Sequence, residues 1–282
     1  LIIQNKSYKI LKIKMSYSII IINYKTCELT AACIKNLLDL PEATETEIIV
    51  IDNASNDGSV EFLQEKFGDR IKLIVNKSNL GFASANNQGA ASAHGEFLLF
   101  LNSDTIIKED IFSACSNIFQ QNKNIGIISP RLLMSDNKYQ PASFGNFPTL
   151  WRLITQKTKI DPVLDENKEY NLVDWVSGCA LMIRKELFTQ LKGWDDNFFL
   201  YYEDIDLCKR ARKFDYLSAV ANKITITHLG GQSLKHSLSK RWHYFRSQNY
   251  YFKKHYGSIT VLILKLVRLP YKLLILIKNH KR

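Results

Sequence analysis

The sequence of 282 residues lacks both common glycine-rich patterns for binding nucleotides. No G-x-G-x-x-G follows the first apolar run, and G-x-x-x-x-G-K-[ST] occurs nowhere. Because such glycines let the backbone approach a pyrophosphate or cradle a triphosphate, their absence disfavours a dehydrogenase and a P-loop protein. A nucleotide would have to be held by side chains and a metal ion.

Cysteine is also scarce. The chain has five, an odd number without a C-x-x-C pair or a metal-like cluster with histidine. We interpret them as small core residues of a protein in a reducing compartment. They are Cys27, Cys33, Cys115, Cys179 and Cys208.

Acidic residues are absent from the end of the chain. None occurs after Asp215, whereas residues 216–282 contain 13 lysines and arginines, so the net charge of +11 is a property of this segment. Such a basic segment could meet nucleic acid or anionic lipid. We expect no nucleic acid, because no helix-turn-helix, zinc-finger or RNP pattern accompanies the charge.

The C-terminus lacks an uninterrupted apolar run of membrane-spanning length. Lys265, Arg268 and Lys272 fall on one stripe of a helix, and Pro270 interrupts the segment. We predict that residues 239–282 form a basic amphipathic helical tail that lies on an anionic membrane surface. The alternative is a C-terminal helix docked on the core.

The N-terminus has no small-residue cleavage site and does not resemble a secretory signal. We expect residues 1–15 to be a loose extension and residues 16–238 to be one catalytic domain, since the chain is long enough to bury one large core.

Apolar runs of strand length alternate with helical patterns between residues 18 and 129. This order predicts an α/β fold with a mainly parallel central sheet flanked by helices on both faces. The predicted strands are 18–23, 47–52, 71–75, 97–101 and 125–129, and the predicted helices are 29–40, 59–67, 82–93 and 109–121.

Polar residues follow four of these strands. Asp, Asn and Ser often end strands and cap helices, which could explain any one of them. Ligands, however, bind at the carboxyl ends of parallel strands, and here four polar ends share one edge. The predicted donor-binding residues are Asn23, Tyr24, Asp52, Asn53, Asn79, Gly81, Asn102 and Asp104.

The segment LFLNSDT is the candidate metal element. A carboxylate at the end of a buried strand suits Mg²⁺ or Mn²⁺ that bridges two phosphates. Asp104 would be the ligand and Asn102 would support it, although the same residues could form an ordinary turn.

Aromatic rings and carboxylates crowd together between residues 194 and 206. Rings stack on sugar C–H faces while carboxylates accept hydroxyl hydrogens, so we predict that Trp194, Tyr202 and Glu203 bind the sugar or acceptor. Asp204 begins a predicted helix over 203–214, where a carboxylate can simply be a cap. Neighbouring carboxylates would also raise its proton affinity, as a general base requires.

Six segments in fixed order resemble the family-two inverting glycosyltransferases of the GT-A fold, within them the rhamnosyltransferase-like branch. The resemblance covers roughly residues 18–228. The segments are SIIIINYKT, IDNASNDGS, NLGFASANNQG, LFLNSDT, WVSGCALMIRKELF and YYEDIDLCKRA.

The resemblance implies a nucleotide-sugar donor, contact of Asp52 with its nucleotide, NSD as the metal element and Asp204 as the base. It also implies that His228, in THLGGQS, is a further metal ligand, although a histidine that ends a strand is more often structural. One residue departs from the family pattern: Asn102 stands where the family usually has a carboxylate, which puts the strength of metal dependence in question.

We therefore expect an enzyme that transfers a sugar with inversion to a glycan or polyprenyl-linked acceptor, as a rhamnosyltransferase in cell-surface polysaccharide synthesis would. It would be cytoplasmic and peripheral on the inner face of the cell membrane. Residues 144–170 form an irregular insertion that could shape the acceptor site. The alternatives are a sugar-phosphate nucleotidyltransferase, which would want a glycine-rich triphosphate loop, and a non-catalytic membrane-peripheral binding module.

Overall fold

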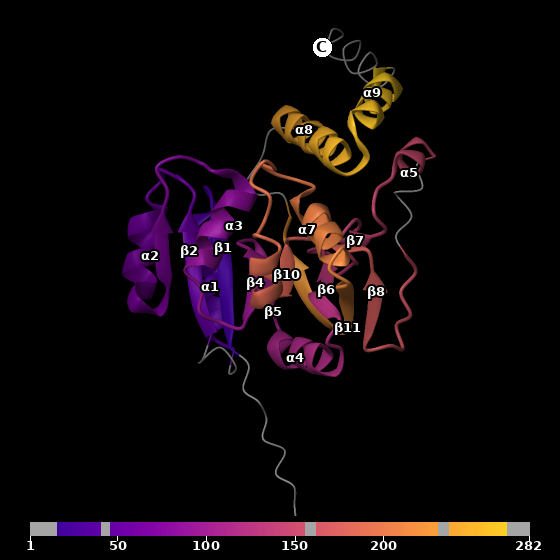
Figure 1. Cartoon of the computed structure of the whole chain (residues 1–282). Helices are drawn as coiled ribbons and strands as arrows, with labels where there is room; N and C mark the ends of the chain where they lie inside the picture. The colour runs from indigo at the N-terminus through magenta and orange to yellow at the C-terminus, as the bar shows by residue number, and fades with distance from the viewer. Residues whose placement is uncertain (1–15, 41–45, 156–161, 231–236, 270–282) are drawn as a thin grey trace, which may run out of the picture.

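The computed structural model describes residues 16–40, 46–155, 162–230 and 237–269 (Figure 1). The predicted extension over 1–15 lies outside these residues, as do Pro270 and Lys272 of the tail. The predicted domain boundary at 238 falls within a helix that begins at Ser237.

Among the described residues, nine strands form one sheet in the order β3-β2-β1-β4-β10-β6-β11-β5, with β8 paired to β11. The strands are β1 (Tyr17–Asn23), β2 (Thr46–Asp52), β3 (Lys72–Val75), β4 (Phe97–Asn102), β5 (Thr105–Ile107), β6 (Ile125–Leu133), β8 (Tyr170–Val173), β10 (Ala180–Arg184) and β11 (Leu217–His228). A separate pair joins β7 (Phe144–Gly145) to β9 (Trp175–Val176).

The helices cover both faces of this sheet. They are α1 (Cys27–Leu38), α2 (Ser59–Phe67), α3 (Gly81–Ala91), α4 (Ile111–Gln121), α5 (Leu150–Ile154), α6 (Lys185–Gln190), α7 (Glu203–Arg212), α8 (Ser237–Tyr256) and α9 (Ser258–Val267), with a short 3-10 helix at Gly68–Arg70. The predicted α/β architecture is confirmed.

Side chains of the central strands alternate between two cores, as the geometry of a strand requires. In β1, Ile19 and Ile21 join the core beneath α1, α2 and α4, whereas Ile20 joins the core beneath α3, α6 and α7. β2 and β4 divide their residues in the same way. Because both faces are covered, these strands read in the sequence as continuous apolar runs.

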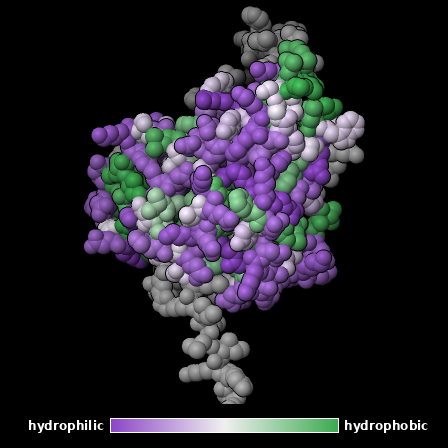
Figure 2. All heavy atoms as spheres, in the orientation of Figure 1, coloured by the Kyte–Doolittle hydropathy of each residue, from purple (hydrophilic) through white to green (hydrophobic). Residues whose placement is uncertain are grey.

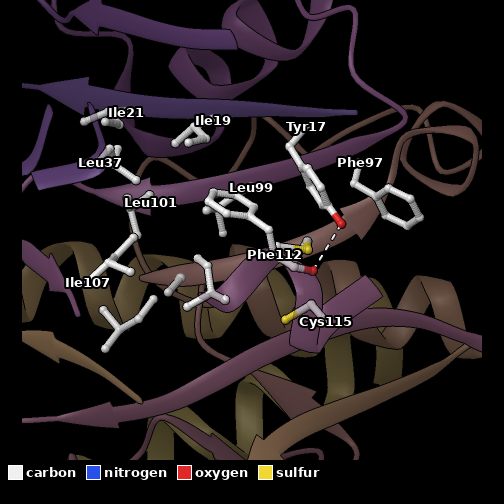
Figure 3. Close-up of a cluster of buried hydrophobic side chains, with 14 of the residues drawn as sticks. Tyr17, Ile19, Ile21, Leu37, Phe97, Leu99, Leu101, Ile107, Phe112 and Cys115 are labelled. Atoms are coloured by element: carbon white, nitrogen blue, oxygen red, sulfur yellow. Dashed lines mark hydrogen bonds between the residues drawn. The ribbon is translucent and has the colours of Figure 1, made fainter. Parts of the chain in front are cut away.

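Tyr17 anchors α4 to the sheet (Figure 3). Its hydroxyl donates a hydrogen bond to the carbonyl oxygen of Phe112 at 3.2 Å, and its ring lies 5.7 Å from that of Phe97, centroid to centroid. Phe97 in turn stacks on Phe119 at 4.7 Å. The phenol oxygen is thus satisfied inside an otherwise apolar core.

The sheet is mostly parallel, and β10 is the main exception. β3, β2, β1 and β4 run parallel, as do β6 and β11, but β10 lies antiparallel between β4 and β6. β5 and β8 are also antiparallel to β11. No sequence feature of the segment 180–184 indicates whether it runs parallel or antiparallel to its neighbours, because a buried strand is mainly apolar in both cases.

A third core attaches α8 and α9 to the domain. Tyr251 and Phe252 of α8 and Leu264 of α9 are buried with Phe198 and Tyr202. Figure 1 shows α8 and α9 together beyond the upper end of the sheet, opposite α4. The segment predicted as a tail therefore includes a helix docked on the core, which was the alternative interpretation.

A buried ionic cluster also ties α8 to α7. Asp206 is completely buried, and its carboxylate lies 2.6 Å from Nε of Arg210, 2.7 Å from Nζ of Lys254 and 2.7 Å from Nε2 of His255. Burial opposes ionisation, but the hydrogen bond from His255 and the charges of Arg210 and Lys254 lower the pKa of Asp206 to about 2. The position of α7, which begins at Glu203, thus depends on α8.

α9 exposes one apolar face. Ile259, Leu262, Ile263 and Leu266 have the spacing of a single helical stripe and are all exposed. Figure 2 shows hydrophobic residues gathered over this helix at the upper right. Within the described part of the chain, no helix combines the length and apolarity that crossing a bilayer requires.

Of the predicted charged stripe of the tail, the structure describes Lys265 and Arg268. Arg268 turns toward α8, where its guanidinium donates to Oδ1 of Asn249 at 2.8 Å and also to Gln248. Arg268 is therefore engaged within the protein, whereas Lys265 is exposed.

Candidate active site

Three adjoining cavities form a cleft at the carboxyl ends of the parallel strands. The central cavity has about 270 Å³ and contacts Asp104 and Gly81. A larger cavity of about 700 Å³ contacts Asp204. These two share a wall made of Phe82, Asn102, Leu200, Tyr201 and His228. A third cavity, of about 480 Å³, shares Tyr24 and Asn79 with the central one.

Asp52, at the end of β2, organises the loop beside the third cavity. Nδ2 of Asn23 donates to Oδ2 of Asp52 at 2.7 Å, and the backbone N–H of Ser55 donates to Oδ1 at 3.0 Å. The carboxylate is 1% exposed, and it is Ser55 that lines the cavity. Direct contact of Asp52 with a nucleotide stays a prediction.

Asn53 joins the loops after β2 and β3. Its side-chain amide donates to Oδ1 of Asn79 at 3.0 Å and to the carbonyl oxygen of Gly81 at 3.2 Å, while its own Oδ1 accepts from the backbone N–H of Leu80 at 3.0 Å. Asn53, Asn79 and Gly81 therefore lie together on the wall of the central cavity.

Asp104 and His228 meet in the central cavity, and His228 also borders the cavity of 700 Å³. Oδ1 of Asp104 lies 3.1 Å from Nε2 of His228, and Nδ2 of Asn102 lies 3.3 Å from the same nitrogen. The other ring nitrogen, Nδ1, lies 2.7 Å from Oε1 of Gln140. β5 and β11 bring these residues together, because their register pairs Thr105 with His228.

This arrangement fits a divalent cation. If Nδ1 donates to Gln140, the lone pair of Nε2 faces the carboxylate of Asp104, and a shared cation would satisfy both acceptors. An imidazole nitrogen and a carboxylate oxygen are suitable ligands for Mn²⁺. Among the described residues, no third histidine, cysteine or carboxylate joins them. Phosphate oxygens and water would have to complete the coordination, as is usual for Mg²⁺ at a nucleotide.

Asp204 lies in the first turn of α7 and borders the 700 Å³ cavity. Its carboxylate accepts from the backbone N–H of Gly178 at 3.0 Å and from that of Ile205 at 2.8 Å. Burial raises the pKa of Asp204, although these two hydrogen bonds oppose the rise. The carboxylate is thus held in a fixed orientation and made more basic.

Glu203, beside Asp204, has a different environment. It is 5% exposed, and its Oε2 has no hydrogen-bond partner among the described residues. Burial and the charge of Asp204 raise the pKa of Glu203 well above its ordinary value. The two carboxylates titrate as a pair, and the two backbone hydrogen bonds favour the ionised form of Asp204.

The structure corrects the prediction that Trp194 binds a sugar. Trp194 is 2% exposed and packs edge-on against Phe82 and Phe100, so neither face of its ring is available for stacking. Tyr201 and Tyr202 do border the large cavity, and Tyr201 borders the central one too. Both tyrosines have left-handed backbones, with φ of 72° and 71°, which is a strained conformation that clusters at functional sites.

The pairing of β10 with β4 brings the two acidic sites together. The backbone N–H of Asn102 donates to the carbonyl oxygen of Cys179 at 2.8 Å, and the neighbouring Gly178 donates to Asp204. Asp104 and Asp204 therefore approach the same wall from its two sides.

Several residues of the cleft were not predicted. Arg152 lies within the insertion of residues 144–170, and Gln140 precedes it. Trp175 and Gly178 belong to the segment WVSGCALMIRKELF, but neither was singled out. Only the general position of the insertion near the acceptor site was predicted, because the residues themselves form no periodic or ligand-like pattern.

The model of glycosyl transferase family 2 matches residues 18–191. This match covers more than half of the chain, and the chain therefore belongs to that family. The matched segment contains Asp52, Asn102 and Asp104 but ends before Asp204 and His228.

Two relatives are similar to about two thirds or more of this chain. The low-salt glycan biosynthesis hexosyltransferase Agl10 of Haloferax volcanii is 35% identical over 203 residues, which cover 70% of this chain and 61% of Agl10. An N-acetylglucosaminyl-diphospho-decaprenol L-rhamnosyltransferase of Mycobacterium tuberculosis is 22% identical over 222 residues, which cover 68% of this chain and 70% of that enzyme.

A solved structure shows the same fold. The crystal structure of GalNAc-T7 with UDP, GalNAc and Mn²⁺ aligns with 84% of this chain at a TM-score of 0.63 and 14% identity. The chain spans 48% of that protein and 61% of Agl10. The likeness confirms the GT-A architecture.

Gly81, on the wall of the central cavity, has no room for a side chain. Its replacement by alanine should therefore lower the free energy of unfolding more than the same replacement at a glycine with an equally left-handed backbone in open space. An alanine Cβ at Gly81, where φ is +81°, would lie 2.6 Å from the carbonyl oxygen of Phe199, whereas one at Gly58, where φ is +84°, meets nothing within 4 Å. Gly58→Ala should cost about 1 to 2 kcal/mol from backbone strain alone. Gly81→Ala should cost clearly more in urea unfolding, and equal losses would contradict the contact.

Proposed function

We propose that this protein is an inverting glycosyltransferase that moves a sugar from a nucleotide-sugar donor to an acceptor hydroxyl. The observation that carries the proposal is the shared wall between the cavity of Asp204 and the cavity of Asp104 and His228. A base on one side and a phosphate-binding element on the other are what single displacement at an anomeric carbon requires.

Asp204 is the proposed general base. Its carboxylate accepts the proton of the acceptor hydroxyl, whose oxygen then attacks the anomeric carbon from the face opposite the leaving diphosphate. The hydrogen bonds from Gly178 and Ile205 hold the carboxylate in place, and burial keeps it basic. Glu203 lines the same cavity and is proposed to contact the acceptor beside Asp204.

The donor occupies the central and third cavities in this proposal. Tyr24 lies at their junction, and Asn53, Asn79 and Gly81 border the central one. Asp104 and His228 would hold Mg²⁺ or Mn²⁺, with Asn102 beside them. The ion would offset the negative charge that gathers on the leaving diphosphate. Tyr201 borders both sides and is the aromatic surface for the transferred sugar.

The other classes are less well supported. A sugar-phosphate nucleotidyltransferase would want a glycine-rich triphosphate loop, which SIIIINYKT lacks, and it gives no role to a half-buried carboxylate such as Asp204. A non-catalytic binding module gives no role to it either, and would neither hydrolyse nor transfer a donor sugar under any metal condition.

The acceptor in this proposal is a glycan attached to a polyprenyl lipid. One relative is named for a diphospho-decaprenol substrate and L-rhamnosyl transfer, and another for hexosyl transfer in glycan synthesis. The exposed apolar stripe of α9 suits the interface of a membrane. The chain from Tyr216 onward contains lysines and arginines but no acidic residue, which suits anionic lipid. We propose that this stripe holds the cleft at the inner face of the cell membrane.

Replacing the base should reduce turnover without loss of donor binding. Asp204→Asn should lower kcat roughly 10²- to 10⁴-fold. Asp196→Asn, an exposed aspartate of the same segment, is the matched control and should turn over normally. Because burial raises the pKa of Asp204, the wild-type kcat should fall on acidification with a midpoint above the ordinary value of about 3.9. Normal turnover by Asp204→Asn would exclude this residue as the base.

Metal-dependent nucleotide binding should depend on Asp104 and, through His228, on Gln140. Asp104→Asn should abolish the Mn²⁺-dependent part of nucleoside diphosphate binding, measured by calorimetry with and without EDTA. Gln140→Ala should weaken Mn²⁺ affinity about tenfold, because the imidazole loses the group that orients it. Asp69→Asn, at an exposed position, is the control. Equal binding by Asp104→Asn and wild type would remove the metal site.

Membrane binding should depend on the apolar stripe of α9. The double variant Leu262→Gln and Leu266→Gln should lose most cosedimentation with vesicles that contain anionic lipid, since about 0.8 kcal/mol is lost per unburied methylene. Val75→Gln removes an exposed apolar side chain from the far edge strand β3 and should sediment like wild type. Unchanged sedimentation of the double variant would contradict this role for α9.

A further inference from the structure

The large cavity has a basic residue at the end formed by the insertion. It extends from Asp204 to α5, where Arg152 and Leu153 line it. Among the described residues, Arg152 is the only lysine or arginine on this lining. The catalytic proposal above uses none of its donors.

The guanidinium of Arg152 is only partly engaged. Nη1 donates to the carbonyl oxygen of Phe147 at 3.2 Å, and no described carboxylate lies within ion-pair distance. The backbone at Arg152 is fixed, because its N–H donates to the capping hydroxyl of Thr149 at 3.2 Å. A positioned guanidinium with free N–H groups is well suited to a phosphate, which it can bind through two parallel hydrogen bonds.

Apolar side chains line the same cavity as Arg152. They include Pro148, Leu153 and Trp175. On the outer side of α5, Trp151 is 69% exposed and Ile154 is 44% exposed.

α5 contacts α9, and Figure 1 shows the two helices on the same side of the molecule. Arg152 therefore lines the cavity on a short helix that exposes Trp151 and Ile154 and contacts α9, the helix that carries the apolar stripe.

We propose that Arg152 binds the phosphate that joins the acceptor sugar to its lipid, and that the lipid chain leaves the cavity over α5 and α9. This inference rests on the proposed function and names the part of the site that recognises the acceptor. A neutral glycan would need no cation beside Leu153 and Trp175. In a lipid-linked acceptor the phosphate stands between the sugar and the isoprenoid chain, just as Arg152 would stand between Asp204 and the apolar side chains of α5 and α9.

The test measures binding of geranyl diphosphate, geraniol and inorganic pyrophosphate by tryptophan fluorescence. EDTA is present throughout, so that Asp104 and His228 cannot bind a diphosphate through a metal. Wild type should bind geranyl diphosphate more tightly than either of the other probes, because it alone engages both the cation and the apolar surface.

Arg152→Gln should weaken geranyl diphosphate binding tenfold or more and leave geraniol binding unchanged. Arg152→Lys, which keeps the charge but loses the paired donors, should lie between Arg152→Gln and wild type. Lys123→Gln removes one positive charge at the amino end of β6 and should bind like wild type. Thermal melting of each variant checks that it is folded.

Equal affinity of wild type and Arg152→Gln for geranyl diphosphate would overturn the proposal. Tighter binding of a uronic acid oligosaccharide than of geranyl diphosphate would overturn the lipid assignment in favour of an acidic glycan.

Failure of the proposed function has a different signature. Wild type would then neither hydrolyse nor transfer a sugar from any nucleotide donor with Mn²⁺, whatever the effect of Arg152→Gln on geranyl diphosphate.

Discussion

The candidate site depends on the insertion of β10, in reverse direction, between β4 and β6. The pairing of Ala180 with Leu101 places the turn before β10 against the end of β4. Cys179 then accepts from the backbone of Asn102, and Gly178 donates to Asp204. Through these backbone contacts the candidate metal element and the proposed base, about a hundred residues apart in the chain, border one cleft.

Hydrogen bonding distinguishes the two adjacent carboxylates of α7. Asp204 receives two backbone hydrogen bonds, whereas one oxygen of Glu203 has no partner among the described residues. Desolvation raises the pKa of both, and the charge of Asp204 raises that of Glu203 further. The helix that carries them is fixed from the other side, because Asp206 is bound by residues of α8. The C-terminal helices are thus part of the support of the site.

Sequence patterns predicted most of the strands and helices of the first half closely. Asn53, Asn102 and Asp104 were found because buried parallel strands are continuous apolar runs that end at a common edge. Trp194 was misassigned for a related reason: aromatic residues near carboxylates suit a sugar site and a core equally well, and only its packing against Phe100 distinguishes them. Gln140 was not predicted, since a glutamine in a loop has no pattern.

The sequence by itself determined the α/β class, the edge of the sheet where ligands would bind and the basic character of the C-terminus, because these follow from the order and composition of local segments. The tertiary structure alone decided the direction of β10, the meeting of Asp104 with His228, and the place of Arg152 on the lining of the large cavity. Such features depend on contacts between distant segments, and no local preference of the chain encodes them.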